Sequence, residues 1–164
     1  MSFAPKHILA PLALGPEDSF EFAKETVEAA CVMAQKLEAH LTLVHVTTIP
    51  IPLEGVDSEV TTKIYDTFSV VLESRIQHAQ TILAQLKELA QSLGVKVKTE
   101  IIDADDGIAN RICHYAQSKH VDLVLINSHS RHGLKRFLLG SIAERIVHIA
   151  SVPVLILKRT KESQ

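Results

Sequence analysis

The amino-acid sequence predicts an α/β protein: an open, doubly wound sheet of five parallel strands with helices on both faces. Three observations lead to this fold class. Short apolar runs alternate with longer segments of helical period along the whole chain, and such alternation favours a parallel sheet. Several runs are apolar nearly throughout, as strands are when helices cover both faces. The 164 residues, of which 46% are hydrophobic, suit a single domain spanning residues 1–164.

Five segments have the composition of strands. The first is a short apolar run closed by a Gly-Pro pair, the second is rich in β-formers, and the fourth is strongly apolar. The third alternates between apolar and polar residues, so we expect it near an edge of the sheet. In chain order the predicted strands are His7–Leu14, His40–Val46, Val95–Ile102, Val121–Ile126 and Val152–Lys158.

The segments between these strands carry apolar residues at helical spacing. The first predicted helix runs from about Phe22 to Leu37, and Asp18 or Ser19 can cap its start. The third predicted helix is Ile108–Ser118. The fourth is Ser141–Ala150, with an inward stripe formed by Ile142, Arg145 to Ile146 and Ile149.

The second predicted helix is unusually long. Its apolar stripe runs from about Val60 to Leu93, and a helix of that length would span about 50 Å. Because one small sheet needs less, we expect the first turn or two to be irregular and the regular helix to begin at about Asp66. Gly94 follows directly, as a helix-ending glycine does.

Charge and composition exclude several classes of protein. Seventeen basic residues face nineteen acidic ones, for a net charge of −2, so neither nucleic acid nor an anionic membrane is an expected partner. No run approaches the roughly 18 apolar residues that a membrane helix needs, and the start lacks the features of a signal peptide. We therefore expect a cytoplasmic protein. Its two cysteines, Cys31 and Cys113, are expected to be small buried hydrophobes.

The residues that follow the fourth strand are the richest in binding chemistry. Ligands of doubly wound sheets bind beyond the carboxyl ends of the strands, where the strand order reverses. Gly140-Ser141 opens a helix there, so free backbone N–H groups and the Ser141 hydroxyl can meet a phosphate. Positive charge lies nearby in Arg131, Lys135 and Arg136. The alternative is that the Gly-Ser pair is an ordinary turn and helix cap.

The chain resembles the universal stress proteins over nearly its whole length. The resemblance begins with HILAPLA and LVHV, and it is most specific in Ser128–Lys158, where LKRFLLGSIAERIV is followed by VPVLIL. It implies a Rossmann-like fold of the universal stress protein type and, for the nucleotide-binding members, an adenine nucleotide as ligand. It also implies a homodimer formed through the last strand, Val152–Lys158, which is apolar and lies at the end of the sheet.

The motif of the nucleotide-binding members is kept in spacing but not in every residue. That motif is Gly, two residues, Gly, nine residues, then Gly followed by Ser or Thr. It falls here on Asn127, Ser130, Gly140 and Ser141. The final Gly-Ser is retained, whereas Asn and Ser replace the first two glycines. Asn tolerates a positive φ better than most residues do, while Ser130 adds a Cβ where the backbone approaches a phosphate.

A second departure concerns the sugar. The resemblance places an Asp that meets the ribose just after the first strand, and Ala13 stands at that position. A lost hydrogen bond would cost about 0.5–1.5 kcal/mol, which weakens a site without abolishing it. The resemblance further implies an apolar base pocket. Its walls would be Pro11 and Leu41, with Ile126 nearby, and Arg131 and Ile142 complete the predicted site.

Metal binding and catalysis find less support. His129, His132 and His45 do not form a zinc constellation. The acidic turn of Asp103, Asp105 and Asp106 could hold Mg²⁺ beside a phosphate, but capping of the next helix explains it better. A relay of Ser128, His129 and Asp105 has no nucleophile elbow to support it. We therefore predict no metal site and no catalytic residue.

Two hypotheses of function remain open. The first is a regulatory module of the stress response that binds ATP or a related adenine nucleotide, with or without Mg²⁺, and hydrolyses it weakly at most. The second is a family member that has lost nucleotide binding and acts as a dimeric interaction protein. Either would act on a protein partner that the sequence does not identify.

Overall fold

The protein forms a five-stranded parallel sheet with two helices on each face. A computed structural model describes residues 3–48, 55, 57–128 and 139–158. The strand order across the sheet is β3-β2-β1-β4-β5, and every neighbouring pair is parallel. This arrangement confirms the predicted fold class. The strands are β1 (His7–Pro11), β2 (His40–Thr48), β3 (Val97–Ala104), β4 (Leu123–Asn127) and β5 (Val154–Leu157).

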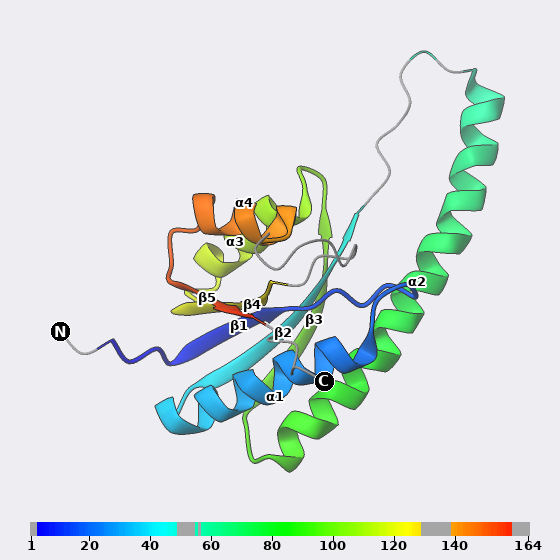
Figure 1. The fold of residues 1–164 in the computed structure, drawn as a ribbon. Coiled ribbons are helices and arrows are strands. Elements are labelled where there is room, and N and C mark those ends of the chain that lie inside the picture. Colours follow the sequence, from blue (N-terminus) through cyan, green and yellow to red (C-terminus); the bar gives the residue numbers. More distant parts are fainter. Residues whose placement is uncertain (1–2, 49–54, 56, 129–138, 159–164) are drawn as a thin grey trace, which may run out of the picture.

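The helices divide between the two faces of the sheet. α1 and α2 cover one face, and α3 and α4 cover the other (Figure 1). The expected edge position of the alternating strand is confirmed, because β3 ends the sheet on one side and β5 ends it on the other. The helices are α1 (Phe20–Leu37), α2 (Ser58–Ser92), α3 (Ile108–Ser118) and α4 (Ser141–Ile149).

Alternate residues of the central strands feed two separate cores. In β1, the fully buried Ile8 packs toward α1 and α2, whereas its neighbour Leu9 packs toward α3 and α4. In β4, Leu125 and Ile126 divide in the same way. This alternation follows from the pleat of a strand. It explains why the residues that face either side of the sheet are apolar in these strands.

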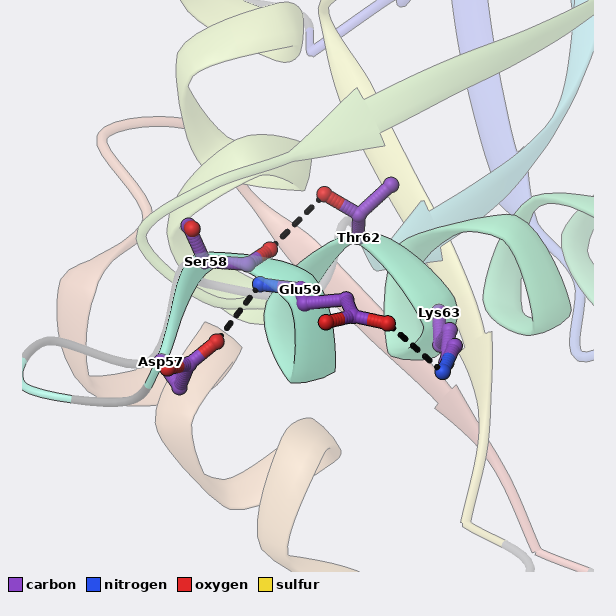
Figure 2. A network of polar contacts seen from close by, with 5 residues as sticks. All are labelled: Asp57, Ser58, Glu59, Thr62 and Lys63. Atoms are coloured by element: carbon purple, nitrogen blue, oxygen red, sulfur yellow. Dashed lines mark hydrogen bonds and ion pairs between the residues drawn. The ribbon is translucent and has the colours of Figure 1, made fainter.

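The start of α2 differs from the prediction. We expected irregular first turns before Asp66, but the helix is continuous from Ser58. Asp57 caps it, because its carboxylate accepts a hydrogen bond from the backbone N–H of Glu59 at 2.8 Å. One turn further along, the Lys63 ammonium lies 3.1 Å from the carboxylate of Glu59 (Figure 2). A cap and an i,i+4 ion pair both stabilise a first turn, so local contacts extend the helix beyond the sheet.

The ends of α2 and α4 give one confirmation and one correction. Gly94 follows α2 with a φ of 75°, as expected of a helix-ending glycine. The predicted inward stripe of α4 is wrong at its first member, because Ile142 is 44% exposed. Ala143 and Ile146 are the buried residues of this helix. Ile146 is buried as predicted, whereas Ala143 takes the inward place that was expected of Ile142.

None of the helices in the described part of the chain has the length and apolar character needed to cross a bilayer.

Candidate functional site

The strand order reverses between β1 and β4. The chain runs outward from β1 through β2 to β3, and then returns to place β4 on the other side of β1. Connections on the two sides of this point leave in opposite directions, and the ligands of such sheets bind at the carboxyl ends of the two strands. Pro11 ends β1 and Asn127 ends β4. The structure therefore brings these two predicted residues to the same edge.

The side chain of Asn127 points toward α1. Its amide nitrogen donates to the Thr26 hydroxyl at 3.3 Å, and that hydroxyl donates in turn to the carbonyl of Phe22 at 2.8 Å. The Asn127 φ is not positive, so the backbone does not need the conformation that asparagine tolerates. Its amide oxygen is buried and has no hydrogen-bond partner among the described residues.

Ile126 faces the opposite side of the sheet from Asn127. It is 4% exposed and packs in the core beneath α3 and α4. Pro11 is half-buried at the end of the neighbouring strand. Parallel pairing of Ile8 with Leu123 and of Leu9 with Val124 carries forward to place Pro11 level with Ile126. The predicted wall Pro11 and the residue predicted to lie nearby, Ile126, are therefore neighbours.

Leu41 is not part of this edge, and its predicted role as a wall of the base pocket is wrong. It pairs with Ile8 near the amino end of β2 and is fully buried against α1 and α2. Val46 lies five residues further along β2, is 8% exposed and shares a core with Ile126. The position of a residue along its strand was the signal that could have found Val46, because the end of a strand, and not its start, reaches the carboxyl edge.

The loop that follows β1 is held by backbone and side-chain contacts. The Leu12 N–H donates to the Val44 carbonyl at 2.8 Å, and the ring nitrogen Nδ1 of His45 lies 2.9 Å from the Leu12 carbonyl oxygen. Burial lowers the pKa of His45, so the neutral ring donates to that carbonyl. Ala13 is exposed, with no carboxylate of its own to offer a sugar. His45 confirms the expectation that it satisfies a backbone group.

Charged residues gather beside this loop, and sequence reasoning missed the cluster. Glu17 pairs with Arg75 of α2 at 2.7 Å. Asp18 accepts a hydrogen bond from the Gly15 N–H at 2.8 Å, and no side chain forms a cap bond at Ser19, the N-cap of α1. Asp18 therefore closes the loop instead of capping the helix. A carboxylate in a Gly-Pro-Glu-Asp loop was the available signal.

Gly140-Ser141 opens α4 as predicted, but the roles of the two residues differ from the prediction. Gly140 is the N-cap, with φ −60° and ψ 151°, and Ser141 is the first helical residue. Gly140, and not the Ser141 hydroxyl, therefore occupies the capping position, and as a glycine it has no side chain to form a cap bond. A helix that joins two parallel strands runs back along the sheet, so its N-terminus lies at the carboxyl edge. Backbone N–H groups and the helix dipole there favour an anion.

Two predicted contacts, Ser130 and Arg131, lie outside the described residues. The same holds for His129, His132, Lys135 and Arg136. Of the predicted set, the structure thus places Pro11, Ala13, Ile126, Asn127, Gly140, Ser141 and Ile142 at or next to the carboxyl edge.

The acidic turn after β3 does not form a metal centre. Asp103 still belongs to β3, and its carboxylate accepts a hydrogen bond from Thr47 at 2.6 Å. The N-cap of α3 is Gly107, without a side-chain cap bond, so the predicted capping by Asp105 or Asp106 is not observed. Within residues 3–48, 55, 57–128 and 139–158, no three His, Cys, Asp or Glu side chains converge as metal ligands would.

The two cysteines are free thiols. Cys31 is fully buried in α1, and Cys113 in α3 is half-buried. Burial raises the pKa of the Cys31 thiol to about 11 and also raises that of Cys113. Neither is a reactive thiolate near neutral pH, and the expected role as small hydrophobes holds best for Cys31.

Comparison with known proteins gives the class to which this chain belongs. A model of the universal stress protein family matches residues 6–158, and the chain belongs to that family. The universal stress protein MJ0531 of Methanocaldococcus jannaschii is 29% identical over 147 residues, which are 90% of this chain and 81% of that protein. The universal stress protein YxiE of Bacillus subtilis is 28% identical and covers 86% of this chain and 94% of its own length.

Solved structures show the same fold. The structure of the protein MJ0577, also of Methanocaldococcus jannaschii, superposes with a TM-score of 0.74 at 23% identity, covering 98% of this chain and all of that one. A universal stress protein solved in complex with cAMP has a TM-score of 0.61 at 14% identity, covering 94% and 98%. The universal stress protein from Archaeoglobus fulgidus in complex with dAMP has a TM-score of 0.60 at 17% identity, covering 91% and 94%.

Proposed function

We propose that this protein binds an adenine nucleotide, such as ATP, at the carboxyl edge between β1 and β4. In this proposal it acts as a regulatory module of the stress response in the cytoplasm, with little or no catalysis. The observation that carries the proposal is the start of α4 at Gly140-Ser141, where the N-cap is a glycine and has no side chain to offer the first N–H groups of the helix. Two family proteins of the same fold were solved with cAMP and dAMP, so the class of ligand has a precedent.

The departures from the family motif predict a modified site more than a lost one. Asn127 has a side chain where the motif has glycine. That side chain bonds Thr26 of α1, so the atoms that it adds lie on the side of the sheet that α1 covers. Ala13 offers no hydrogen bond to a ribose. We expect the affinity to be lower than in a site with that bond, by up to about tenfold.

The second candidate function is a family member without a nucleotide. Ala13 favours it, because the exposed position just after β1 carries no polar side chain. In that case the protein would act through protein contacts alone. A titration with nucleotide separates the two candidates.

A variant of the N-cap tests the proposed site. Gly140→Asp places a carboxylate where the proposal puts phosphate, and two like charges 4 Å apart repel by about 1 kcal/mol in water and about 4 kcal/mol near a protein surface. The affinity for Mg²⁺-ATP, measured by calorimetry, should fall at least about fivefold. The fold should survive, because Gly140 already has the extended backbone of an N-cap, a position that Asp favours.

Val147→Asp is the matched control. It adds the same charge to the same helix, at a side chain that is 45% exposed, about 9 Å beyond the first residue of α4. The control should bind as the wild type does. Unchanged affinity in Gly140→Asp, or an equal loss in both variants, would place the ligand elsewhere.

We also propose a homodimer formed through β5. The strand ends the sheet, pairs with β4 on one side, and is partly exposed at all four residues. An apolar edge of this kind is a template for pairing with a second copy.

A further inference from the structure

Two stacked histidines lie at the amino edge of the sheet, opposite the proposed nucleotide site. His7 begins β1 and His40 begins β2, and the two residues are paired in the sheet register. Their ring centroids lie 4.1 Å apart, and the ring planes differ by 27°. His40 is exposed, whereas His7 is half-buried. A proton on each ring would therefore bring two positive charges face to face, where they repel.

The polar partners of the His7 ring suit its neutral form. Nitrogen Nε2 lies 2.9 Å from the Thr42 hydroxyl oxygen, and the backbone carbonyl of Lys119 accepts a hydrogen bond from the ring. A neutral imidazole has one donor and one acceptor, so it donates to the carbonyl and accepts from the hydroxyl. Thr42 is 2% exposed, and its hydroxyl has no other hydrogen-bond partner among the described residues. A proton on Nε2 would leave the proton of that buried hydroxyl without an acceptor.

The Lys119 carbonyl belongs to the turn that joins α3 to β4. Lys119 is the C-cap of α3, and the Val121 N–H bonds back to the last turn of that helix at 2.9 Å. Between them, His120 has a φ of 52°, a left-handed conformation that glycine adopts readily and that a side chain makes unfavourable. The turn therefore needs contacts that hold it. His7 supplies two, because its ring bonds Lys119 and its own carbonyl accepts the Asp122 N–H at 2.9 Å.

Charged groups act on His7 from the elements around it. Burial is the main effect and lowers the pKa of His7, and His40 of β2 and Lys98 of β3 lower it further. The Lys119 carbonyl and the Asp122 carboxylate ahead of β4 raise this pKa. That carboxylate is already engaged, since it accepts the backbone N–H of His7 at 2.9 Å. The Lys119 ammonium lies 5.8 Å from the centroid of an aromatic ring of α3.

We propose that His7 is an acid-sensitive latch, which holds the turn after α3 to the sheet while its ring is neutral and releases the turn when the ring takes up a proton beside His40. In an opened turn the ring reaches water and titrates at about pH 6.5, whereas the closed state takes up that proton only at lower pH. The open state therefore binds more protons, and its population rises as the pH falls below about 6.5. The latch lies at the edge opposite the proposed nucleotide site and does not depend on it.

Hydrogen exchange of the wild type and of His7→Gln tests the latch. A glutamine amide can donate to one partner and accept from the other, but it takes up no proton in this pH range. The protection factor of the Asp122 amide should fall by up to about tenfold between about pH 7 and about pH 5.5 in the wild type, and should stay constant in His7→Gln. His45 is present in both proteins, so its effect cancels. A wild type without this fall, or an equal fall in both proteins, overturns the proposal.

A titration of the rings tests the latch without altering His7. His40→Phe keeps an aromatic ring in the stack and removes its charge. NMR follows the ring C–H signals of His7, which should take up its proton at a higher pH in His40→Phe than in the wild type, because the repulsion across the stack is gone. The matched control is His78→Phe, at an exposed position of α2 on the other face of the sheet (Figure 1). A His7 midpoint that stays in place in His40→Phe, or moves equally in the control, contradicts the proposal.

Discussion

His45 shows how a single residue ties the candidate site to the sheet. It lies near the end of β2, yet its ring bonds the Leu12 carbonyl in the loop after β1. Burial is the main effect and lowers the pKa of His45. The nearby carboxylates of Asp18 and Glu17 raise this pKa, and the Arg75 guanidinium lowers it further. The neutral ring therefore holds the loop that follows β1 at the carboxyl edge of the sheet.

Replacing His45 by Gln should change the pH dependence of stability. The unfolded histidine takes up a proton near pH 6.5, but the folded one does so only at lower pH. Between these values the unfolded state binds more protons, so the free energy of unfolding of the wild type falls as the pH drops below about 6.5. The variant lacks this term. We expect it to be about 1 kcal/mol less stable near pH 7.

Urea unfolding at about pH 7 and about pH 5.5 measures the two differences. The gap between wild type and variant should narrow at the lower pH. His7, whose pKa burial also lowers, is present in both proteins, so its effect cancels. A gap that widens toward acid would show that the folded ring gains stability from its proton.

Individual site residues were the least predictable level. Asn127 and Gly140 were placed correctly because they adjoin a strand end and a helix start, which sequence patterns mark well. Leu41 was misplaced because apolar residues at the two ends of a strand look alike, and only the strand register separates Leu41 from Val46. Asp18 or Ser19 was expected to cap α1. Ser19 is the N-cap residue, whereas the Asp18 carboxylate bonds the Gly15 N–H. The choice of a carboxylate between a loop N–H and a helix N–H does not affect the spacing of apolar residues, so the sequence pattern cannot reveal it.

The elements themselves could be predicted almost completely. Each of the five strands and four helices appears in the order expected, because apolar runs and helical stripes are direct consequences of burial. The start of α2 was the exception. The prediction assumed that a helix stops where its packing stops, whereas Asp57 and the Lys63–Glu59 pair begin it at Ser58.

The edge strand β5 predicts a measurable dimer contact. The carbonyls of Pro153 and Leu157 bond β4, and main-chain groups alternate in direction along a strand. The N–H groups of Val154 and Ile156 therefore face the open edge. If two copies pair through β5, these two amides should exchange with deuterium slowly at micromolar concentration, and light scattering should give the mass of at least two chains. A monomer at that concentration, with both amides exchanging freely, would contradict the dimer.

At the scale of the whole molecule, fold and family follow from sequence more readily than ligand does. The parallel sheet follows from the alternation of strands and helices, and the match over residues 6–158 agrees with it. The ligand depends on a few side chains at one edge, and this chain has Ala13 in place of the expected aspartate and Asn127 in place of the expected glycine. Those substitutions change affinity by amounts that a fold does not reveal.

The central claim is that the carboxyl edge between β1 and β4 binds an adenine nucleotide, and the native protein tests it most directly. The protein is purified without added ligand and denatured, and the released small molecules are identified by mass spectrometry. The emptied protein is then titrated with Mg²⁺-ATP in a calorimeter. The account predicts a co-purified adenine nucleotide or a micromolar dissociation constant. No nucleotide and no heat at millimolar ATP would contradict it, and would assign the protein to the class that acts through protein contacts alone.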